Sequence, residues 1–503
     1  GVGALFVFVF AFQYSSLYNI FTYVFPYTYA ASLGVLLLLS VFYAGYRALE
    51  TEKTVWFSRL GLLLALASLT KVEFIVAAVL FVLLLLPLLV LKTRRQGAFS
   101  RRRLGKWLWA LAWPAGGVLI PVCGYFASRV DLLEYYRNEL ARMTSLNLPA
   151  ARAKMGAEHL QASLIIVGGV VLAYAALAVV FFGVDRLAQR VERRTTARAL
   201  RMLCTAGLGL SVAAVAAWTA HALRPINMFA GMAAWIPLIG ACAAWAIWIS
   251  ERDERTSNAA IFVACTAVVS FVLLIRILLN ARPLGYGVFL MVPGTLLLLY
   301  SVFAFLPAML RRRGSRGRFH VWGFAVFFAV AGTMNFAFSL HQYRAKNVAV
   351  ATARGTMRLP RDQASALTQL LEFFRDKRDY SLLVLPEGNM INFLLDSIPK
   401  TYSYAYVPGL LKTPAQEDRI IREIREIPID YVLVVTRWTT EFGFPVVGVD
   451  YAWRLKQVID ANYQSVAQFG PPPFSRKGFG MLLMERKDRL GAAEPVPGIG
   501  TAP

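Results

Sequence analysis

The chain has 503 residues, of which 57% are hydrophobic and 13% aromatic, and its formal net charge is +24. Its mean hydropathy of +0.53 excludes an ordinary soluble protein and predicts a polytopic membrane protein. The basic residues lie in short loops between apolar runs rather than on one face or arm. We therefore expect no nucleic-acid partner.

The first segment, residues 1–12, is apolar and has neither a charged start nor a small-residue cleavage site. This pattern predicts a fragment that lacks the N-terminal part of the protein. Residues 13–27 are densely aromatic and suit the headgroup layer of a membrane. Tyr27 closes this segment, and Pro26 would end a surface helix before the first complete span.

A membrane-crossing helix needs about 20 apolar residues, because a helix rises about 1.5 Å per residue and the hydrocarbon core is about 30 Å thick. After residue 27 we find ten such runs, the second of them short: 28–48, 56–70, 74–92, 107–126, 161–183, 202–220, 231–250, 259–278, 286–305 and 321–339. The result is a predicted α-helical bundle over residues 1–340.

Three loops rich in arginine and lysine are typical of the cytoplasmic side under the positive-inside rule: 92–106, 186–201 and 311–318. Alternation from these loops places the turn with Lys71 and Glu73 outside, together with 127–160, 221–230, 279–285 and the C-terminal part. Within the outer segment 127–160, "VDLLEYYRNELARM" (130–143) has the apolar spacing of an interfacial amphipathic helix.

From Arg344 the composition changes to that of a soluble α/β domain, which we expect over 341–488 on the extracytoplasmic side. The apolar spacing predicts helices over 362–377, 389–396, 413–427 and 450–463, with a Thr413 cap before Pro414. Buried strands are predicted over 380–386 and 430–436, and a strand pair over 465–470 and 478–486. Residues 489–503 are predicted to be a disordered tail.

Four stretches carry a family resemblance: "FPYTYAA" (25–31), "GLLLALASLTKVEF" (61–74), "RPLGYGVFLMVP" (282–293) and "LLVLPEGNMINFL" (382–394). Together and in this order they resemble the bacterial GT-C membrane glycosyltransferases, in particular the glycosyltransferase family 39-like group related to the dolichyl-phosphate-mannose protein mannosyltransferases. The resemblance implies a multi-pass enzyme of the bacterial inner membrane. Such an enzyme transfers a sugar from a polyprenyl-phosphate donor to a glycan, lipid or protein acceptor on the outer face.

The resemblance also implies a catalytic carboxylate in the first outer loop, but residues 13–27 contain no Asp or Glu. The catalytic base is therefore expected upstream of Gly1 and is not assigned to a residue. Asp131 and Glu134 are the nearest outer carboxylates that could replace it, although each also fits the solvated face of a surface helix. The four cysteines lie in apolar stretches and the four histidines are scattered, so we expect no metal and no cofactor beyond the donor lipid.

Lys71 is the first candidate for binding the donor phosphate, because a lysine on the outer face supplies a compact charge to the leaving group. Glu73 is predicted to support it, by orienting Lys71 or by binding an acceptor hydroxyl. The alternative is that Lys71 is a snorkelling residue that pairs with Glu73 or with lipid. Tyr27, within "FPYTYAA", is the second supporting residue.

Arg224 and Arg282 are the other phosphate-binding candidates, since each is the only Lys or Arg of a short outer loop and arginine binds phosphate bidentately. Each could instead anchor a helix end at the headgroups. Glu387 in "LPEGN" follows a predicted strand and opens a helix, so we interpret it as structural or acceptor-facing.

Two other functions remain open at this point. A polysaccharide ligase or polymerase of similar architecture is not separable from a glycosyltransferase by sequence. A lipid or solute transporter is less consistent, because few ionisable residues lie deep within the spans and no inverted repeat is visible. Arg276, near the end of one span, is an exception.

Overall fold

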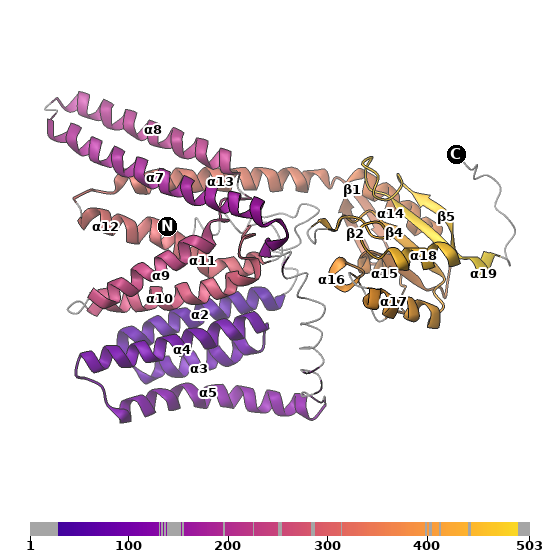
Figure 1. The fold of residues 1–503 in the computed structure, drawn as a ribbon, viewed down its shortest axis with the longest axis horizontal. Helices are drawn as coiled ribbons and strands as arrows, with labels where there is room; N and C mark the ends of the chain where they lie inside the picture. Colours follow the sequence, from indigo (N-terminus) through magenta and orange to yellow (C-terminus); the bar gives the residue numbers. More distant parts are fainter. Residues whose placement is uncertain are drawn as a thin grey trace. The chain divides into compact units, whose positions relative to one another are not determined.

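A computed structural model of the chain describes residues 29–490, apart from most of 130–154 and from 195–196, 225, 250–253, 283–286, 313, 398–399, 402–404, 412–413 and 441–443. The described residues divide into a helical unit that ends at Tyr343 and an α/β unit that begins at Arg344 (Figure 1). Tyr27 and the predicted tail lie outside the described residues.

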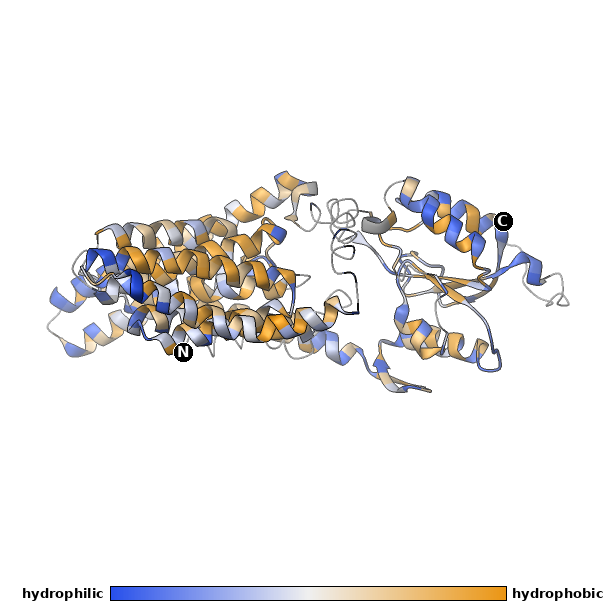
Figure 2. Cartoon of the chain, turned by 90° about the horizontal axis from the view of Figure 1, so that it is seen from below, coloured by the Kyte–Doolittle hydropathy of each residue, from blue (hydrophilic) through white to orange (hydrophobic). Residues whose placement is uncertain are grey.

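The helical unit is a bundle of long apolar helices. Its elements are α2 (Tyr29–Thr51), α3 (Thr54–Ser68), α4 (Val72–Arg95), α5 (Arg101–Ala127), η1 (Ala157–His159), α7 (Leu160–Arg194), α8 (Arg198–Leu223), α9 (Met232–Ile249), α10 (Glu254–Leu274), η2 (Ile275–Ile277), η3 (Val288–Met291), α11 (Val292–Tyr300), η4 (Ser301–Phe305), α12 (Leu306–Arg312) and α13 (Arg318–Ala345). Figure 2 shows that hydrophobic residues predominate along these helices.

Within the described ranges, nine helical segments are long and apolar enough to cross a membrane, and α3 is a shorter apolar helix of 15 residues. Each of the ten predicted runs falls on one of these segments, although α7 continues to Arg194, 11 residues beyond the predicted end at 183, and α5 and α13 extend six residues past one end of their predicted runs. The prediction of a multi-pass helical bundle is therefore confirmed.

Close approach of α2 to α4 depends on two glycines that face aromatic rings. A Cβ on Gly34 would lie 2.2 Å from the Phe74 ring, and one on Gly45 would lie 2.4 Å from the Phe81 ring. Both rings are buried. Membrane helices pack closely where small residues let their backbones approach. We call Gly34 and Gly45 the glycine notches, because each leaves room for a ring of α4 and so allows α4 to pack closely on α2.

The α/β unit contains a hairpin and a four-stranded sheet. The hairpin pairs β1 (Val348–Thr352) with β2 (Gly355–Leu359), and the sheet has the order β3-β4-β6-β5. Its strands are β3 (Leu382–Leu385), β4 (Tyr431–Val435), β5 (Tyr463–Phe469) and β6 (Met481–Arg486). β3 and β4 are parallel and the other pairs antiparallel.

Helices lie on both faces of this sheet. They are α14 (Arg361–Phe373), α15 (Asn389–Leu394), α16 (Pro408–Leu411), α17 (Pro414–Glu426) and α18 (Trp453–Asn462), and the short α19 (Lys487–Leu490) follows β6. Leu382 and Val384 pack in one apolar core with α14, whereas Leu383 and Leu385 pack in the other with α17 and α18. This alternation is that of a strand buried on both faces.

The helices and strands predicted between 362 and 486 are all present, so the prediction of a small α/β region is confirmed. Thr413 lies outside the described residues, and the structure begins α17 at Pro414 as the sequence indicates. The β1–β2 hairpin was not predicted. The side of the membrane on which this unit lies stays a prediction.

Candidate phosphate-binding site

Lys71 and Glu73 lie where α3 gives way to α4. The Thr70 hydroxyl donates to the Ala67 carbonyl at 2.7 Å, and Lys71 has the extended backbone of a helix N-cap. Glu73 is in the first turn of α4, where the helix dipole favours a negative charge. The predicted polar turn is confirmed, and neither charge lies in the middle of a span.

Glu73 forms an ion pair with Arg276, which lies 203 residues away in η2 at the end of α10. The Arg276 Nη1 donates to Glu73 Oε1. Sequence reasoning singled out Arg276 but gave it no partner, and it proposed that Glu73 orients Lys71. The structure gives no bond between Lys71 and Glu73, whose carboxylate is directed to α10.

Two further cations, Lys71 and Arg282, lie at the same end of α4 and α10 as the Glu73–Arg276 ion pair and do not take part in it. Lys71 is half-buried at the start of α4, and Arg282 is half-buried in the link between η2 and η3. Neither has an ion-pair partner within the described ranges. Burial lowers the pKa of Arg282, yet an arginine keeps its charge because its pKa starts so high.

The described ends of the η2–η3 link, on either side of residues 283–286, pack against the bundle. Ala281 is fully buried, and Gly287 has a φ of +107°, where a Cβ would lie 2.7 Å from Ile277. The left-handed backbone at Gly287 suits glycine. Arg282 is thus carried by a link whose two ends pack on the end of α10.

The structure separates Arg224 from this group. Arg224 ends α8 with an exposed side chain and a left-handed φ of +58°. Helix α8 packs along α7, and Figure 1 shows this pair apart from α2, α3 and α4. Arg224 and Lys71 therefore belong to different parts of the bundle, and Tyr27 is outside the described residues.

The remaining carboxylate candidates have local roles. Asp131 Oδ1 accepts a hydrogen bond from the Glu134 backbone N–H at 3.0 Å, as a helix cap does, and both residues are exposed. Glu387 Oε2 lies 3.6 Å from Arg437 Nε, which follows the neighbouring strand β4. A Cβ on Gly388 would lie 2.1 Å from Val384, so the glycine of "LPEGN" serves close packing.

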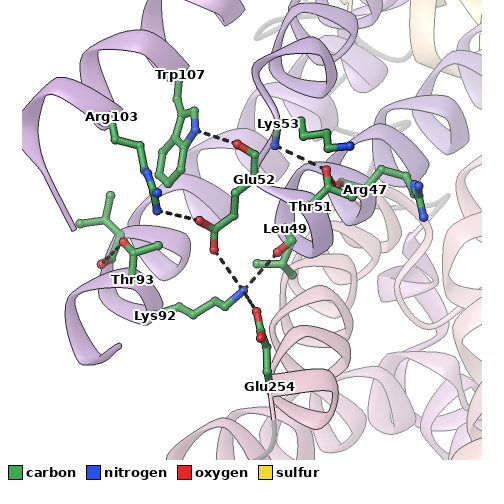
Figure 3. Close-up of polar contacts among 11 residues, drawn as sticks. Arg47, Leu49, Thr51, Glu52, Lys53, Lys92, Thr93, Arg103, Trp107 and Glu254 are labelled. Carbon is green, nitrogen blue, oxygen red and sulfur yellow. Dashed lines mark hydrogen bonds and ion pairs between the residues drawn. The ribbon is translucent and has the colours of Figure 1, made fainter. Parts of the chain in front are cut away.

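A second polar cluster lies at the other end of α4 and was missed in the sequence, where Lys92 looked like one of many loop cations (Figure 3). Lys92 is buried, and its Nζ lies 2.9 Å from Glu254 Oε1, 3.4 Å from Glu52 Oε1 and 3.3 Å from the Leu49 carbonyl. The hydrogen bond and charge of Lys92 lower the pKa of Glu254. The signal that could have revealed the cluster is acidic. Glu52 and Glu254 lie in two short polar segments, 50–53 and 251–255, that each contain more acidic than basic residues, unlike the basic loop 92–106.

Glu52 connects this cluster to α5. Its Oε2 lies 3.0 Å from Arg103 Nη1, and its backbone carbonyl accepts a hydrogen bond from Trp107 Nε1 at 3.2 Å. Four helices, α2, α4, α5 and α10, therefore meet around one buried ammonium group. A buried charge needs such partners because its desolvation is costly.

A third polar cluster caps α13. Asp185, buried near the end of α7, accepts hydrogen bonds from the Ser315 hydroxyl and from the backbone N–H groups of Gly317 at 2.9 Å and Arg318 at 3.1 Å. These N–H groups would otherwise be unsatisfied at the start of the helix. The role of Asp185 is therefore structural.

Among the described residues, no group of three or more His, Cys, Asp or Glu side chains is placed to hold a metal ion. The fold and its charges define a multi-pass membrane protein with an α/β unit after the last span. No protein-family model matches the chain, and no curated protein sequence matches it at the significance required.

Proposed function

We propose that the chain is a membrane glycosyltransferase that moves a sugar from a polyprenyl-phosphate donor to an acceptor, and that Lys71 and Arg282 bind the donor phosphate. The single observation that carries this proposal is electrostatic. At one end of α4 and α10, Glu73 and Arg276 neutralise each other, and two half-buried cations, Lys71 and Arg282, are left without a carboxylate partner in the described part of the chain.

Two such cations favour an anionic ligand at the membrane boundary, since an unpaired half-buried charge is costly. A lipid phosphate meets this requirement from the membrane side, with its chain in the hydrocarbon. Of the anionic lipids, a polyprenyl-phosphate sugar is indicated by the resemblance of the segments around Lys71 and Arg282 to the GT-C enzymes.

The proposed chemistry is phosphate departure assisted by positive charge. As the bond between sugar and phosphate oxygen breaks, negative charge grows on the phosphate, and a fixed ammonium or guanidinium group stabilises that charge more than it stabilises the ground state. The acceptor hydroxyl gives its proton to a base and its oxygen takes the sugar. We assign no residue to that base.

The test is Lys71→Met, which keeps the side-chain length but removes the charge. Transfer from a radiolabelled polyprenyl-phosphate sugar in membranes should fall by about 10²-fold, the scale of losing an electrostatic donor in a transition state. Lys71→Arg should recover part of the rate, because the charge is kept although its shape is not.

Lys53→Met is the matched control. Lys53 is the N-cap of α3 as Lys71 is of α4, with an extended backbone and no side-chain cap bond, but at the opposite end of the bundle. It should leave transfer unchanged. An unmodified rate in Lys71→Met would remove Lys71 from the site. Lipid movement across the membrane without any sugar transfer by the unmodified protein would instead favour a transporter.

A further inference from the structure

An open groove lies between α2 and α3 on the outer surface of the bundle. Its volume is about 270 Å³, and it is lined by Ser40, Tyr43, Ala44, Trp56, Arg59, Leu62 and Leu63. Apart from the hydroxyls of Ser40 and Tyr43, the Trp56 indole N–H and the Arg59 guanidinium, the side chains that line it are apolar. Nothing in the proposed transfer reaction uses this groove.

The mouth of the groove carries a stacked set of aromatic and cationic groups. The Arg59 guanidinium lies 4.4 Å from the centre of the Trp56 ring, and that of Arg47 lies 5.4 Å from it. Tyr43 meets Trp56 edge to face at 5.8 Å. Stacking on the indole restricts Arg59, so less of its freedom is lost when it binds an anion.

The charges of this set are not balanced. Arg47 is paired with Glu50 at 2.6 Å, whereas Arg59 is exposed and has no ion-pair partner in the described ranges. The groove therefore carries one unpaired positive charge, that of Arg59, beside its apolar lining. That combination is complementary to an anionic headgroup with an acyl chain.

The position of Arg59 along α3 agrees with such a ligand. Helix α3 begins at Thr54, immediately after the turn that joins the Lys92 cluster. Arg59 lies about 8 Å along the helix axis from that start, at about 1.5 Å per residue, so its long side chain can reach headgroups at this end of α3. Leu62 and Leu63 lie one turn deeper.

We propose that the groove between α2 and α3 binds one anionic glycerophospholipid, with the phosphate on Arg59 and an acyl chain along Leu62, Leu63 and Ala44. The neighbouring loop 92–106 is basic, as in cytoplasmic loops, so the lipid would come from the inner leaflet. This site lies at the opposite end of α3 from Lys71, and it is independent of the proposed transfer reaction.

The test compares lipid binding by the purified full chain and its variants. Native mass spectrometry with phosphatidylglycerol should show one lipid bound more tightly than the rest in the unmodified protein. Arg59→Gln should weaken that lipid about tenfold, the loss of one charge-assisted hydrogen bond, and Arg59→Lys should weaken it less. Phosphatidylcholine should show no such site.

Arg102→Gln is the control, because Arg102 is an exposed cation on the same side of the bundle but outside the groove. Equal weakening by Arg102→Gln would mean general attraction to basic loops and would overturn the site. So would binding of phosphatidylcholine with equal strength. Displacement of phosphatidylglycerol by polyprenyl phosphate, but not by inorganic phosphate, would reassign the groove to the donor lipid and would also contradict the proposal.

Discussion

Lys92 and Glu254 join α4 to α10 at the opposite end of the helix pair from Glu73 and Arg276. The Lys92 Nζ lies 2.9 Å from Glu254 Oε1. Along the chain, α4 carries Glu73 at its start and Lys92 near its end, and α10 with η2 carries Glu254 at its start and Arg276 at its end, so the acid of one meets the base of the other because the two run antiparallel. From residue 73 to residue 92 the helix covers about 28 Å at about 1.5 Å per residue. Two antiparallel helices are thus tied at both ends with an apolar contact between.

The first prediction concerns the Glu73–Arg276 pair. Glu73→Gln should lower the free energy of unfolding by about 1 to 2 kcal/mol, because the half-buried Arg276 guanidinium loses the Glu73 carboxylate. The reversed pair, Glu73→Arg with Arg276→Glu, should recover stability that each single reversal loses. Thermal unfolding in detergent measures all four proteins. A double variant no more stable than the singles would mean that the pair contributes nothing.

The second prediction concerns Lys92. Lys92→Met should destabilise the bundle by about 1 to 2 kcal/mol. Glu52 and Glu254 lose the ammonium group that lies between them, but Glu52 keeps Arg103 and Glu254 is largely exposed. Lys106→Met removes an exposed cation near the same end and should have little effect. Equal melting temperatures for the two variants would show that Lys92 is dispensable.

The third prediction is a pH dependence. Lys92 lowers the pKa of Glu254 below its usual value of 4.5. A carboxyl group whose pKa is lower in the folded state gives stability above the unfolded pKa, and that stability is lost as pH falls through the folded pKa. The unfolding temperature should therefore decline below about pH 4.5. Glu254→Gln should reduce this decline, and an identical decline in the variant would contradict the assignment.

The fourth prediction concerns the glycine notches. Gly34→Ala should destabilise the bundle by about 1 to 3 kcal/mol, because the new methyl group would overlap the Phe74 ring. Gly117→Ala on α5 meets no atom within 4 Å and is the control. Phe74→Leu should partly rescue Gly34→Ala by leaving room for the methyl group. Failure of that rescue would mean that backbone effects, not the ring, cause the loss.

The fifth prediction tests the alternation of the loops. In a background without Cys123, Cys204, Cys242 and Cys265, a cysteine introduced by Ala353→Cys should react with a membrane-impermeant maleimide in intact cells. One introduced by Gln96→Cys should react only after permeabilisation. Both positions are exposed in the structure. Reaction of the Gln96 variant in intact cells would invert the predicted topology.

Sequence alone predicted the bundle because span length and charged loops are local properties. The Lys71–Glu73 turn was predictable, since an apolar run from 56 to 92 is too long for one span. The partner of Glu73 was not, because pairing across 203 residues depends on which helices pack together. Lys92 was missed for the same reason: a lysine in a basic loop looks solvated until three other helices close around it.

In the α/β unit, buried strands such as 431–435 were visible as apolar runs, whereas β1 and β2 were not. Their residues, "VAVAT" and "GTMRL", are small or polar at most positions and are mostly not buried. Gly355, with a φ of +120°, was the turn signal that could have revealed the hairpin. The candidate phosphate-binding residues could be named one by one from the sequence. Only the packing of the helices places Lys71 and Arg282 at the same end of α4 and α10 and sets Arg224 apart.

The two ion pairs between α4 and α10, Glu73–Arg276 at one end and Lys92–Glu254 at the other, tie these helices together and make the bundle sensitive to the thickness of the bilayer around it. In a membrane much thicker than their separation, one tie would be drawn into hydrocarbon, and in a much thinner one apolar helix surface would meet water. Either mismatch costs fractions of a kcal/mol per Å. Because Lys71 lies beside one tie, a change of bilayer thickness would move this residue relative to the lipid phosphates.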